Sequence, residues 1–379
     1  MKARVIYLSI VLALLATTAP AQWDIQDSHT TASLRGIDNV GKGVAWASGT
    51  DGTVLRTEDG GYVWQLCAIP PGAEKLDFRG IQASDANTAI VMSSGKGDLS
   101  RLYKTTDGCQ TWKLIFTNPD KDGFFDSIRT TAPKTIYVLG DPVAGKFAMY
   151  FTDDSGSNWF TAADPGRDAS AADGAFAASN SALLPIGPFL FFGTSASTNA
   201  PPHIYFTQAK CVAPPDHPKA FPTQCSIEWK RSEVPLASGS SRSGIFSLDG
   251  YMSPTKSGIP KITIVAIGGT YDKPEQASNI VASSDDGGRT WSASTTPPHG
   301  FRSAVAYDAD QKLWITVGPN GTDISTDDGR NWRALKPSST DPPDADKNWN
   351  ALSLPYVVGP NGRIGKLRTI SVNNPVVRK

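Results

Sequence analysis

The sequence predicts an all-β, seven-bladed β-propeller, because two short elements recur along it and hardly any helical periodicity follows residue 21. Five eight-residue segments, at 57–64, 105–112, 152–159, 284–291 and 325–332, follow or nearly follow the pattern Ser/Thr-x-Asp-x-Gly-x-Thr/Asn-Trp. Seven apolar, β-rich runs recur at 44–49, 88–92, 136–140, 189–193, 262–268, 313–318 and 356–359. Such runs suit strands buried on both faces, so seven runs predict seven blades.

Each of the five repeated segments has the form of an Asp box, a tight hairpin turn. The Asp carboxylate and the Ser/Thr hydroxyl can accept backbone N–H bonds, Gly takes a conformation that other residues resist, and Trp packs against the sheet. A turn repeated in every unit is a folding device, so these residues are assigned a structural role and neither catalysis nor calcium binding. The structural residues are Asp59, Trp64, Asp107, Trp112, Asp154, Trp159, Asp286, Trp291, Asp327 and Trp332.

Two of the seven repeats lack the box. In the fourth, an insertion separates the strand at 203–207 from the one at 227–229, which keeps Trp229. In the seventh, residues 362–367 form a third strand and no turn follows. Residues 22–26 resemble the strand after each box, which begins with Trp, so we expect the N-terminus to supply the last outer strand and close the ring.

Residues 1–21 have the layout of a secretory signal peptide. Lys2 and Arg4 precede the apolar run 5–16, and Ala19-Pro20-Ala21 offers a cleavage site. We therefore expect a mature domain of residues 22–379 in the periplasm or outside the cell. No other segment approaches the roughly 20 apolar residues that a membrane span needs, so stable membrane insertion is not expected.

The charge balance and the cysteines bear on partners and stability. Removing Lys2 and Arg4 from 36 basic residues leaves 34 against 36 acidic ones, so no net field attracts nucleic acid. Cys211 and Cys225 bracket a Pro-rich loop and are the favoured disulfide in an oxidising compartment. Cys67 and Cys109 are either a second bridge or buried thiols, which the sequence leaves open.

The first repeat carries a family resemblance. Leu34-Arg-Gly-Ile37 followed by the repeat at 44–64 resembles the photosystem II stability/assembly-factor-like (BNR repeat) propellers, within the Asp-box superfamily that includes sialidases and sortilin-type ectodomains. The likeness extends over nearly the whole mature chain. Members related to the photosynthetic factors bind precursor membrane-protein segments, so the resemblance implies a protein partner. The resemblance also implies that Arg35, Arg79, Arg242 and Arg302 contribute to an arginine-rich surface like the one in that family.

One polar position recurs where each inner strand is expected to start. These candidate ligand-binding residues are Arg35, Arg79, Asp126, Asp173, Arg242, Arg302 and Asn350. In a propeller this position faces the mouth of the central channel, where converging guanidiniums suit a carboxylate or another anion. The alternative is that Arg35 pairs with Asp126 or Asp173 and that the ring only joins adjacent blades.

The favoured function is an exported, non-enzymatic binding or assembly module that recognises a protein segment or an anionic small molecule at the channel mouth. The alternative is a sialidase-like, exo-acting glycoside hydrolase, because Phe78-Arg79-Gly80-Ile81 resembles the sialidase Phe-Arg-Ile-Pro motif except at Gly80. Such enzymes pair a Tyr nucleophile with a Glu. Only five Glu residues occur, none of them expected at the channel. No metal site, catalytic residue or cofactor is predicted.

Overall fold

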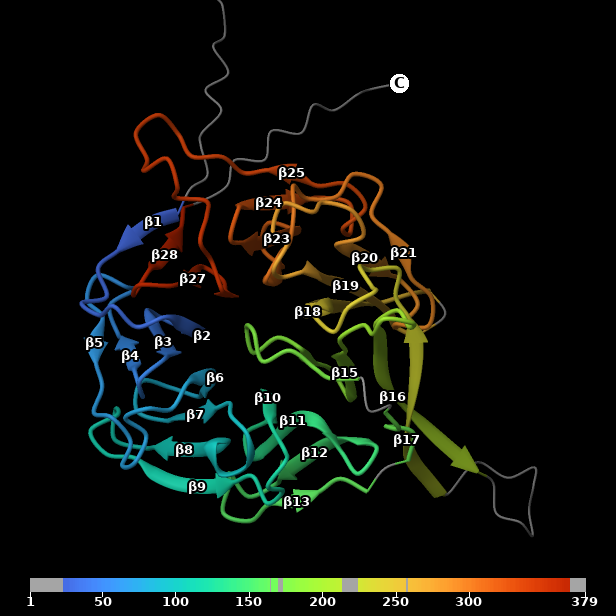
Figure 1. The fold of residues 1–379 in the computed structure, drawn as a ribbon, viewed down its shortest axis with the longest axis horizontal. Helices are drawn as coiled ribbons and strands as arrows, with labels where there is room; N and C mark the ends of the chain where they lie inside the picture. The colour runs from blue at the N-terminus through green and yellow to red at the C-terminus, as the bar shows by residue number, and fades with distance from the viewer. Residues whose placement is uncertain (1–22, 164, 170–172, 213–223, 257, 369–379) are drawn as a thin grey trace, which may run out of the picture.

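Seven four-stranded antiparallel sheets surround a central channel like the blades of a propeller (Figure 1). The computed structural model describes residues 23–163, 165–169, 173–212, 224–256 and 258–368. In six of the blades the strands run in chain order from the channel outward, and this arrangement of seven sheets confirms the predicted fold class. The only helical element in the described part of the chain is the short 3-10 turn η1 (Gly97–Leu99). No helix in those ranges is long and apolar enough to cross a membrane.

The first three blades use consecutive strands. Blade 1 contains β2 (Leu34–Gly41), β3 (Val44–Gly49), β4 (Val54–Thr57) and β5 (Gln65–Leu66). Blade 2 contains β6 (Phe78–Ala83), β7 (Ala89–Ser93), β8 (Arg101–Thr105) and β9 (Lys113–Thr117). Blade 3 contains β10 (Phe125–Ala132), β11 (Thr135–Val143), β12 (Lys146–Thr152) and β13 (Phe160–Thr161).

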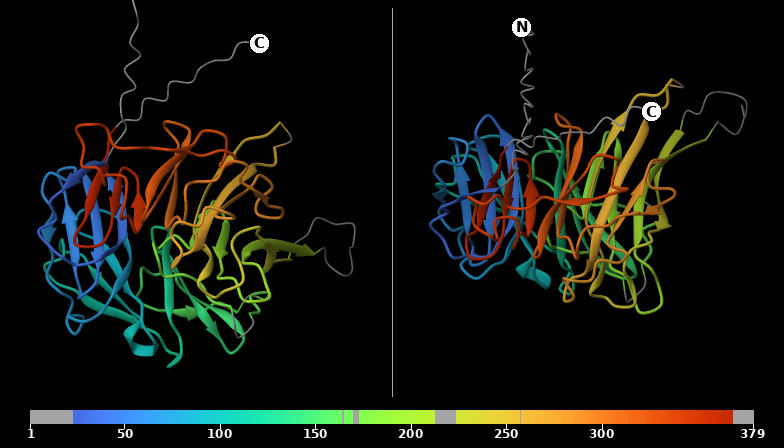
Figure 2. Two further views of the ribbon diagram at one scale, coloured as in Figure 1. Left: turned by 45° about the horizontal axis from the view of Figure 1, so that its top comes forward. Right: turned by 90° about the horizontal axis from the view of Figure 1, so that it is seen from above.

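The next three blades follow the same order. Blade 4 contains β14 (Leu183–Ile186), β15 (Phe189–Gly193), β16 (His203–Val212) and β17 (Gln224–Glu233). Blade 5 contains β18 (Ser243–Ser253), β19 (Lys261–Thr270), β20 (Val281–Ser284) and β21 (Ser292–Ala293). Blade 6 contains β22 (Ala304–Asp308), β23 (Leu313–Gly318), β24 (Gly321–Ser325) and β25 (Arg333–Ala334). The long hairpins of blades 4 and 5 extend beyond the rest of the disc (Figure 2).

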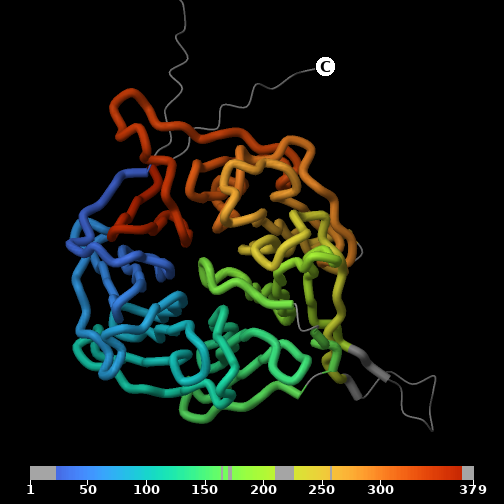
Figure 3. Tube along the Cα trace, viewed as in Figure 1, coloured from blue at the N-terminus to red at the C-terminus, as the bar shows by residue number. Residues whose placement is uncertain are grey.

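Blade 7 joins the two ends of the chain. It contains β26 (Ala351–Ser353), β27 (Tyr356–Val358), β28 (Ile364–Leu367) and, as its outer strand, β1 (Trp23–Gln26). Trp23 lies opposite Leu367 in the β1–β28 ladder, and its Nε1 donates to Thr322 Oγ1 of blade 6 at 3.1 Å. The trace in Figure 3 shows this blue strand beside the red one. The predicted closure of the ring by an N-terminal strand is therefore confirmed.

The five repeated turns contain the hydrogen bonds expected of them. In the first, Thr57 Oγ1 accepts from the Gly61 N–H at 3.0 Å and Asp59 Oδ1 accepts from the Val63 N–H at 3.0 Å. Equivalent bonds occur in the other four turns. Because the strands alternate in direction, these turns lie on the face of the disc opposite to the starts of the inner strands.

Cys67 and Cys109 form a disulfide that links blade 1 to the repeated turn of blade 2. This settles the alternative that the sequence left open. Cys109 has a φ of 66°, at a position that is glycine in the other four turns. The backbone register of β16 and β17 places Cys211 opposite Cys225, but the side chains of this favoured pair lie outside the described residues. That prediction stays a prediction.

Candidate functional site at the channel mouth

One end of the channel opens into a cavity of about 680 Å³. Its walls come from the starts of inner strands and the loops before them, in blades 1–3 and 5–7. The lining residues are Arg35, Arg79, Phe124, Asp126, Asp141, Ala175, Phe176, Ala177, Ala178, Ser241, Arg242, Phe246, Tyr271, Phe301, Ser303 and Asn350. A volume of this size accommodates a ligand of several residues, since small-molecule sites are typically about 300–1,000 Å³.

A loop of blade 4, residues 173–182, forms one wall of the cavity and reaches toward the centre of the ring (Figure 3). We call it the central loop. Asn180 anchors it to two blades: its Oδ1 accepts from the Ile128 N–H at 2.8 Å, and its Nδ2 donates to Ile81 O at 3.2 Å. Ser181 Oγ donates to Ser247 Oγ of blade 5 at 2.7 Å. The loop is therefore held by blades 2, 3 and 5.

Two predicted arginines share one carboxylate at the cavity wall. Arg79 Nε lies 2.8 Å from Asp77 Oδ2, and Arg35 Nε lies 3.3 Å from Asp77 Oδ1. Arg79 Nη1 also donates to Ala177 O of the central loop at 3.3 Å. Burial lowers the pKa of the Arg35 guanidinium, Asp77 raises it and the neighbouring Arg79 lowers it. Two guanidiniums therefore share a single carboxylate at this wall, and guanidinium groups are suited to bind a further carboxylate.

Two further carboxyl groups lie in the same cavity. Asp126 is buried, and neither of its carboxyl oxygens has a hydrogen-bond partner. Burial, together with the nearby Asp141, raises the pKa of Asp126 well above its ordinary value. Burial also raises the pKa of Asp141, although a hydrogen bond from the Ala175 N–H opposes the shift. The positive charge of the nearby Arg79 opposes this rise in the pKa of Asp126.

Another part of the cavity wall is aromatic. Phe176 of the central loop stacks on Phe246 of β18, with ring centroids 3.7 Å apart and planes inclined by 13°. Phe246 also meets the edges of Tyr271 and Phe301, at centroid distances of 6.2 and 4.7 Å. Arg242 lies on this side, 61% exposed and 2.8 Å from Asp272. The sequence did not identify this aromatic wall, because its members come from four separate segments.

The structure brings five of the seven predicted site residues into the cavity lining: Arg35, Arg79, Asp126, Arg242 and Asn350. Asn350 donates its side-chain N–H to Leu34 O at 2.8 Å and so links blade 7 to blade 1. Asp173 and Arg302 are not among the lining residues. Asp173 belongs to the central loop, and β14 begins only at Leu183, so aligning Asp173 with the inner-strand starts was wrong.

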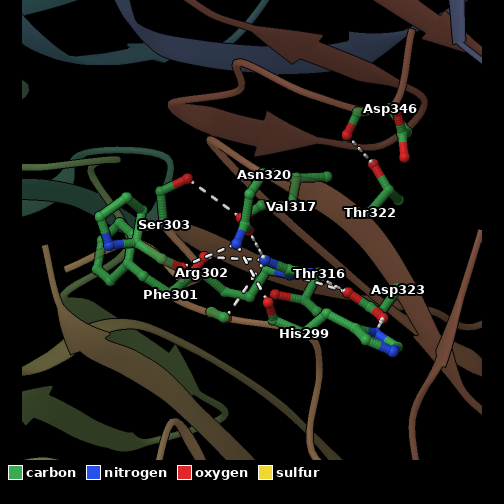
Figure 4. A network of polar contacts seen from close by, with 12 residues as sticks. His299, Phe301, Arg302, Ser303, Thr316, Val317, Asn320, Thr322, Asp323 and Asp346 are labelled. Atoms are coloured by element: carbon green, nitrogen blue, oxygen red, sulfur yellow. Dashed lines mark hydrogen bonds and ion pairs between the residues drawn. The ribbon is translucent and has the colours of Figure 1, made fainter. Parts of the chain in front are cut away.

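Arg302 is a buried link within blade 6 (Figure 4). Arg302 and Asp323 are each 1% exposed, and the guanidinium donates to the carboxylate through Nε at 2.9 Å and through Nη2. Nη1 donates to Phe301 O at 3.0 Å and to Asn320 Oδ1. Because its donors are engaged in this way, Arg302 is a structural link. The alternative interpretation gave such a linking role to all seven polar residues at the inner-strand starts.

A second charged cluster, not identified in the sequence, lies three residues further along the inner strands. Arg129 donates through Nε to Leu183 O at 3.0 Å and interacts with both Asp38 and Asp249. Asp38 accepts from the Ala83 N–H, and Asp249 from the Tyr307 N–H, each at 2.7 Å. Burial raises the pKa of each of these carboxyls to about 6. The three-residue spacing Arg35 to Asp38 and Asp126 to Arg129 is the signal that could have revealed it.

Hydrolase chemistry of the sialidase type requires a Tyr and a Glu together. Tyr271 lines the cavity, but no Glu is among its lining residues. No group of three or more His, Cys, Asp or Glu side chains suited to a metal ion occurs within the described ranges.

Fold and cavity together define the class of this protein: a seven-bladed propeller whose channel mouth is lined by arginine, aspartate and aromatic side chains. More particularly, the family model described as "Photosynthesis system II assembly factor YCF48" matches residues 15–177, which include Arg35, Arg79, Asp126 and Phe176. The resemblance to the photosystem II assembly-factor-like propellers is therefore confirmed. No curated protein matches this chain.

Two solved structures of that kind have a similar fold. The first, titled "YCF48 bound to D1 peptide", has 17% sequence identity and a TM-score of 0.56, and the match covers 92% of this chain and 97% of that one. The second, YCF48 from Cyanidioschyzon merolae, has 18% identity and a TM-score of 0.56, covering 92% of this chain and 99% of that one. At these identities the likeness establishes the shared fold.

Proposed function

We propose that this protein is an exported binding module that holds a segment of a partner protein at the channel mouth through a carboxylate of that segment. The family resemblance supports a protein partner, since a YCF48 structure of similar fold contains a bound D1 peptide. The layout of residues 1–21 supports export.

The observation that carries the proposal is the shared pairing of Arg35 and Arg79 with Asp77. A closed joining pair, such as Arg302 with Asp323, balances one cation with one anion in a space that excludes a ligand. Here two guanidiniums share one carboxylate beside an open cavity of about 680 Å³. A ligand carboxylate would accept charge-assisted hydrogen bonds from these guanidiniums.

The test is the affinity of an N-acetylated, C-terminally amidated pentapeptide, Ala-Ala-Asp-Phe-Ala, measured by isothermal titration calorimetry. Its partner peptide has Asn in place of Asp. We expect the Asp peptide to bind about tenfold or more tightly than the Asn peptide, as a hydrogen bond between charged groups contributes about 1.5–3 kcal/mol. Arg35→Gln and Arg79→Gln should each abolish most of that difference.

Arg333→Gln is the matched control, because Arg333 is an exposed arginine on the outer strand β25. It should leave both affinities unchanged. Binding should also weaken between low and high salt, since the contact is electrostatic and partly exposed. Equal affinities for the Asp and Asn peptides, or an equal loss in Arg333→Gln, would contradict the proposal.

A further inference from the structure

We infer that the channel mouth selects a carboxylate that has an apolar or aromatic side chain next to it, the carboxylate bound at Arg35 and Arg79 and the side chain at Phe176 and Tyr271. The inference rests on the proposed function and adds to it the chemical class of the segment recognised. Both pairs of residues line the same cavity.

The aromatic wall is built to present ring surface rather than to bury it. Phe246 is buried and contacts both of the more exposed rings, Phe176 by stacking and Tyr271 edge-on, and the buried Phe301 packs against Phe246. Phe176 lies half-buried on the central loop, and Tyr271 is 49% exposed. Apolar surface that lines a concave site beside a few placed polar groups is typical of ligand recognition.

The backbone around these two rings is fixed. The Tyr271 N–H donates to Arg242 O at 3.2 Å, and the central loop that carries Phe176 is anchored at Asn180 and Ser181. The rings are therefore held in place before a ligand arrives. Preorganised rings lose little conformational freedom on binding, which favours affinity.

The two walls differ in chemistry, so the ligand must differ along its length in the same way. A free carboxylate alone would leave the rings of Phe176 and Tyr271 in water, and an apolar peptide alone would leave the charge at Arg35 and Arg79 unmatched. Two sources have the required chemistry: an Asp or Glu side chain beside an apolar residue, or the free carboxyl end of a chain whose last residue is apolar.

The experiment compares four N-acetylated peptides by calorimetry. Two are amides, Ala-Ala-Asp-Phe-Ala and Ala-Ala-Asp-Ala-Ala, and two have free carboxyl ends, tetra-alanyl-phenylalanine and penta-alanine. For at least one source, we expect the Phe peptide to bind about five- to tenfold more tightly than its Ala counterpart. One aromatic contact contributes a gain in affinity of this size. The pair that shows this difference identifies the source.

Phe176→Ala and Tyr271→Ala should reduce that preference to about twofold or less. The control is Tyr62→Ala, because Tyr62 is 88% exposed and lies in the first repeated turn, on the opposite face of the disc. Phe176→Leu keeps an apolar side chain in the loop and should retain a partial preference, which separates loss of recognition from a misfolded loop.

Equal affinities for Phe and Ala peptides from both sources would overturn the inference. If those affinities still depended on Arg35 and Arg79, the proposed function would stand and only the inferred aromatic preference would fail. A Phe preference that survives in Phe176→Ala and Tyr271→Ala would also overturn it. If arginine substitution had no effect on any peptide, the proposed function itself would fail.

Discussion

The disulfide between Cys67 and Cys109 allows a quantitative prediction about stability. The bridge closes a loop with a sequence separation of 42 residues. In the chain-entropy treatment, closing a loop of that length restricts the unfolded chain by about 4 kcal/mol at 25 °C. The variant Cys67→Ala/Cys109→Ala should therefore lose about 4 kcal/mol in the free energy of unfolding, measured by urea denaturation followed by tryptophan fluorescence.

A second variant tests the backbone of the same turn. Cys109 has a φ of 66°, a left-handed conformation that costs a residue with a side chain about 1–2 kcal/mol and that Gly adopts freely. Cys67→Ala/Cys109→Gly should therefore be more stable than the double Ala variant by about 1 kcal/mol. Wild-type protein in reducing agent, which keeps both sulfurs, should resemble the double Ala variant.

Two results would refute this reasoning. A loss below about 1 kcal/mol in the double Ala variant would show that the bridge does not restrict the unfolded chain as the loop length requires. A Gly variant less stable than the Ala variant would show that the conformation at position 109 is not the source of the difference.

The remaining predictions concern buried groups. Asp126 has a pKa raised above its unfolded value of about 3.9, so its stabilising effect is complete below that pH and is lost as the pH rises through the folded pKa. Asp126→Asn should reduce the slope of unfolding free energy against pH, and this variant should be more stable than wild type at pH 7. Asp38 and Asp249 have pKa values of about 6, so they should maintain the slope that remains between pH 4 and 6. A pH series of urea midpoints checks this, and an unchanged slope would contradict it. Arg302→Met should lower the unfolding free energy by about 3–5 kcal/mol, because it leaves a buried carboxylate unpaired; in whatever fraction stays folded, peptide affinity should be unchanged. Trp23→Ala should cost about 3–5 kcal/mol by emptying the core where the ring closes, and a loss confined to less than 1 kcal/mol would show that β1 contributes little to closure.

The architecture could be predicted from the sequence because its determinants are local. A turn that bonds its own N–H groups through Thr57 and Asp59 requires only eight consecutive residues, and so does each of its copies. The N-terminal strand could be predicted as well, since Trp23 begins a segment like those that follow the turns. Seven apolar runs then determine the number of blades.

The site could be predicted only in part because its other determinants are long-range. Arg79 and Arg302 occupy equivalent positions in the sequence, but only Arg302 has an aspartate on the third strand of its own blade, at Asp323. The central loop was taken for a strand start because Asp173-Gly-Ala resembles one. Its true conformation depends on bonds from Asn180 to residues about 50 and 100 positions away, which no local pattern reveals.

We have proposed that Arg35 and Arg79 at the channel mouth bind a carboxylate of the partner. The most direct measurement is a crystal structure of the mature protein with the amidated peptide Ala-Ala-Asp-Phe-Ala. We expect a peptide carboxylate about 2.7–2.9 Å from guanidinium nitrogens of Arg35 or Arg79, with the phenyl ring against Phe176 or Tyr271. A peptide bound elsewhere on the disc, with water alone at these guanidiniums, would contradict the claim.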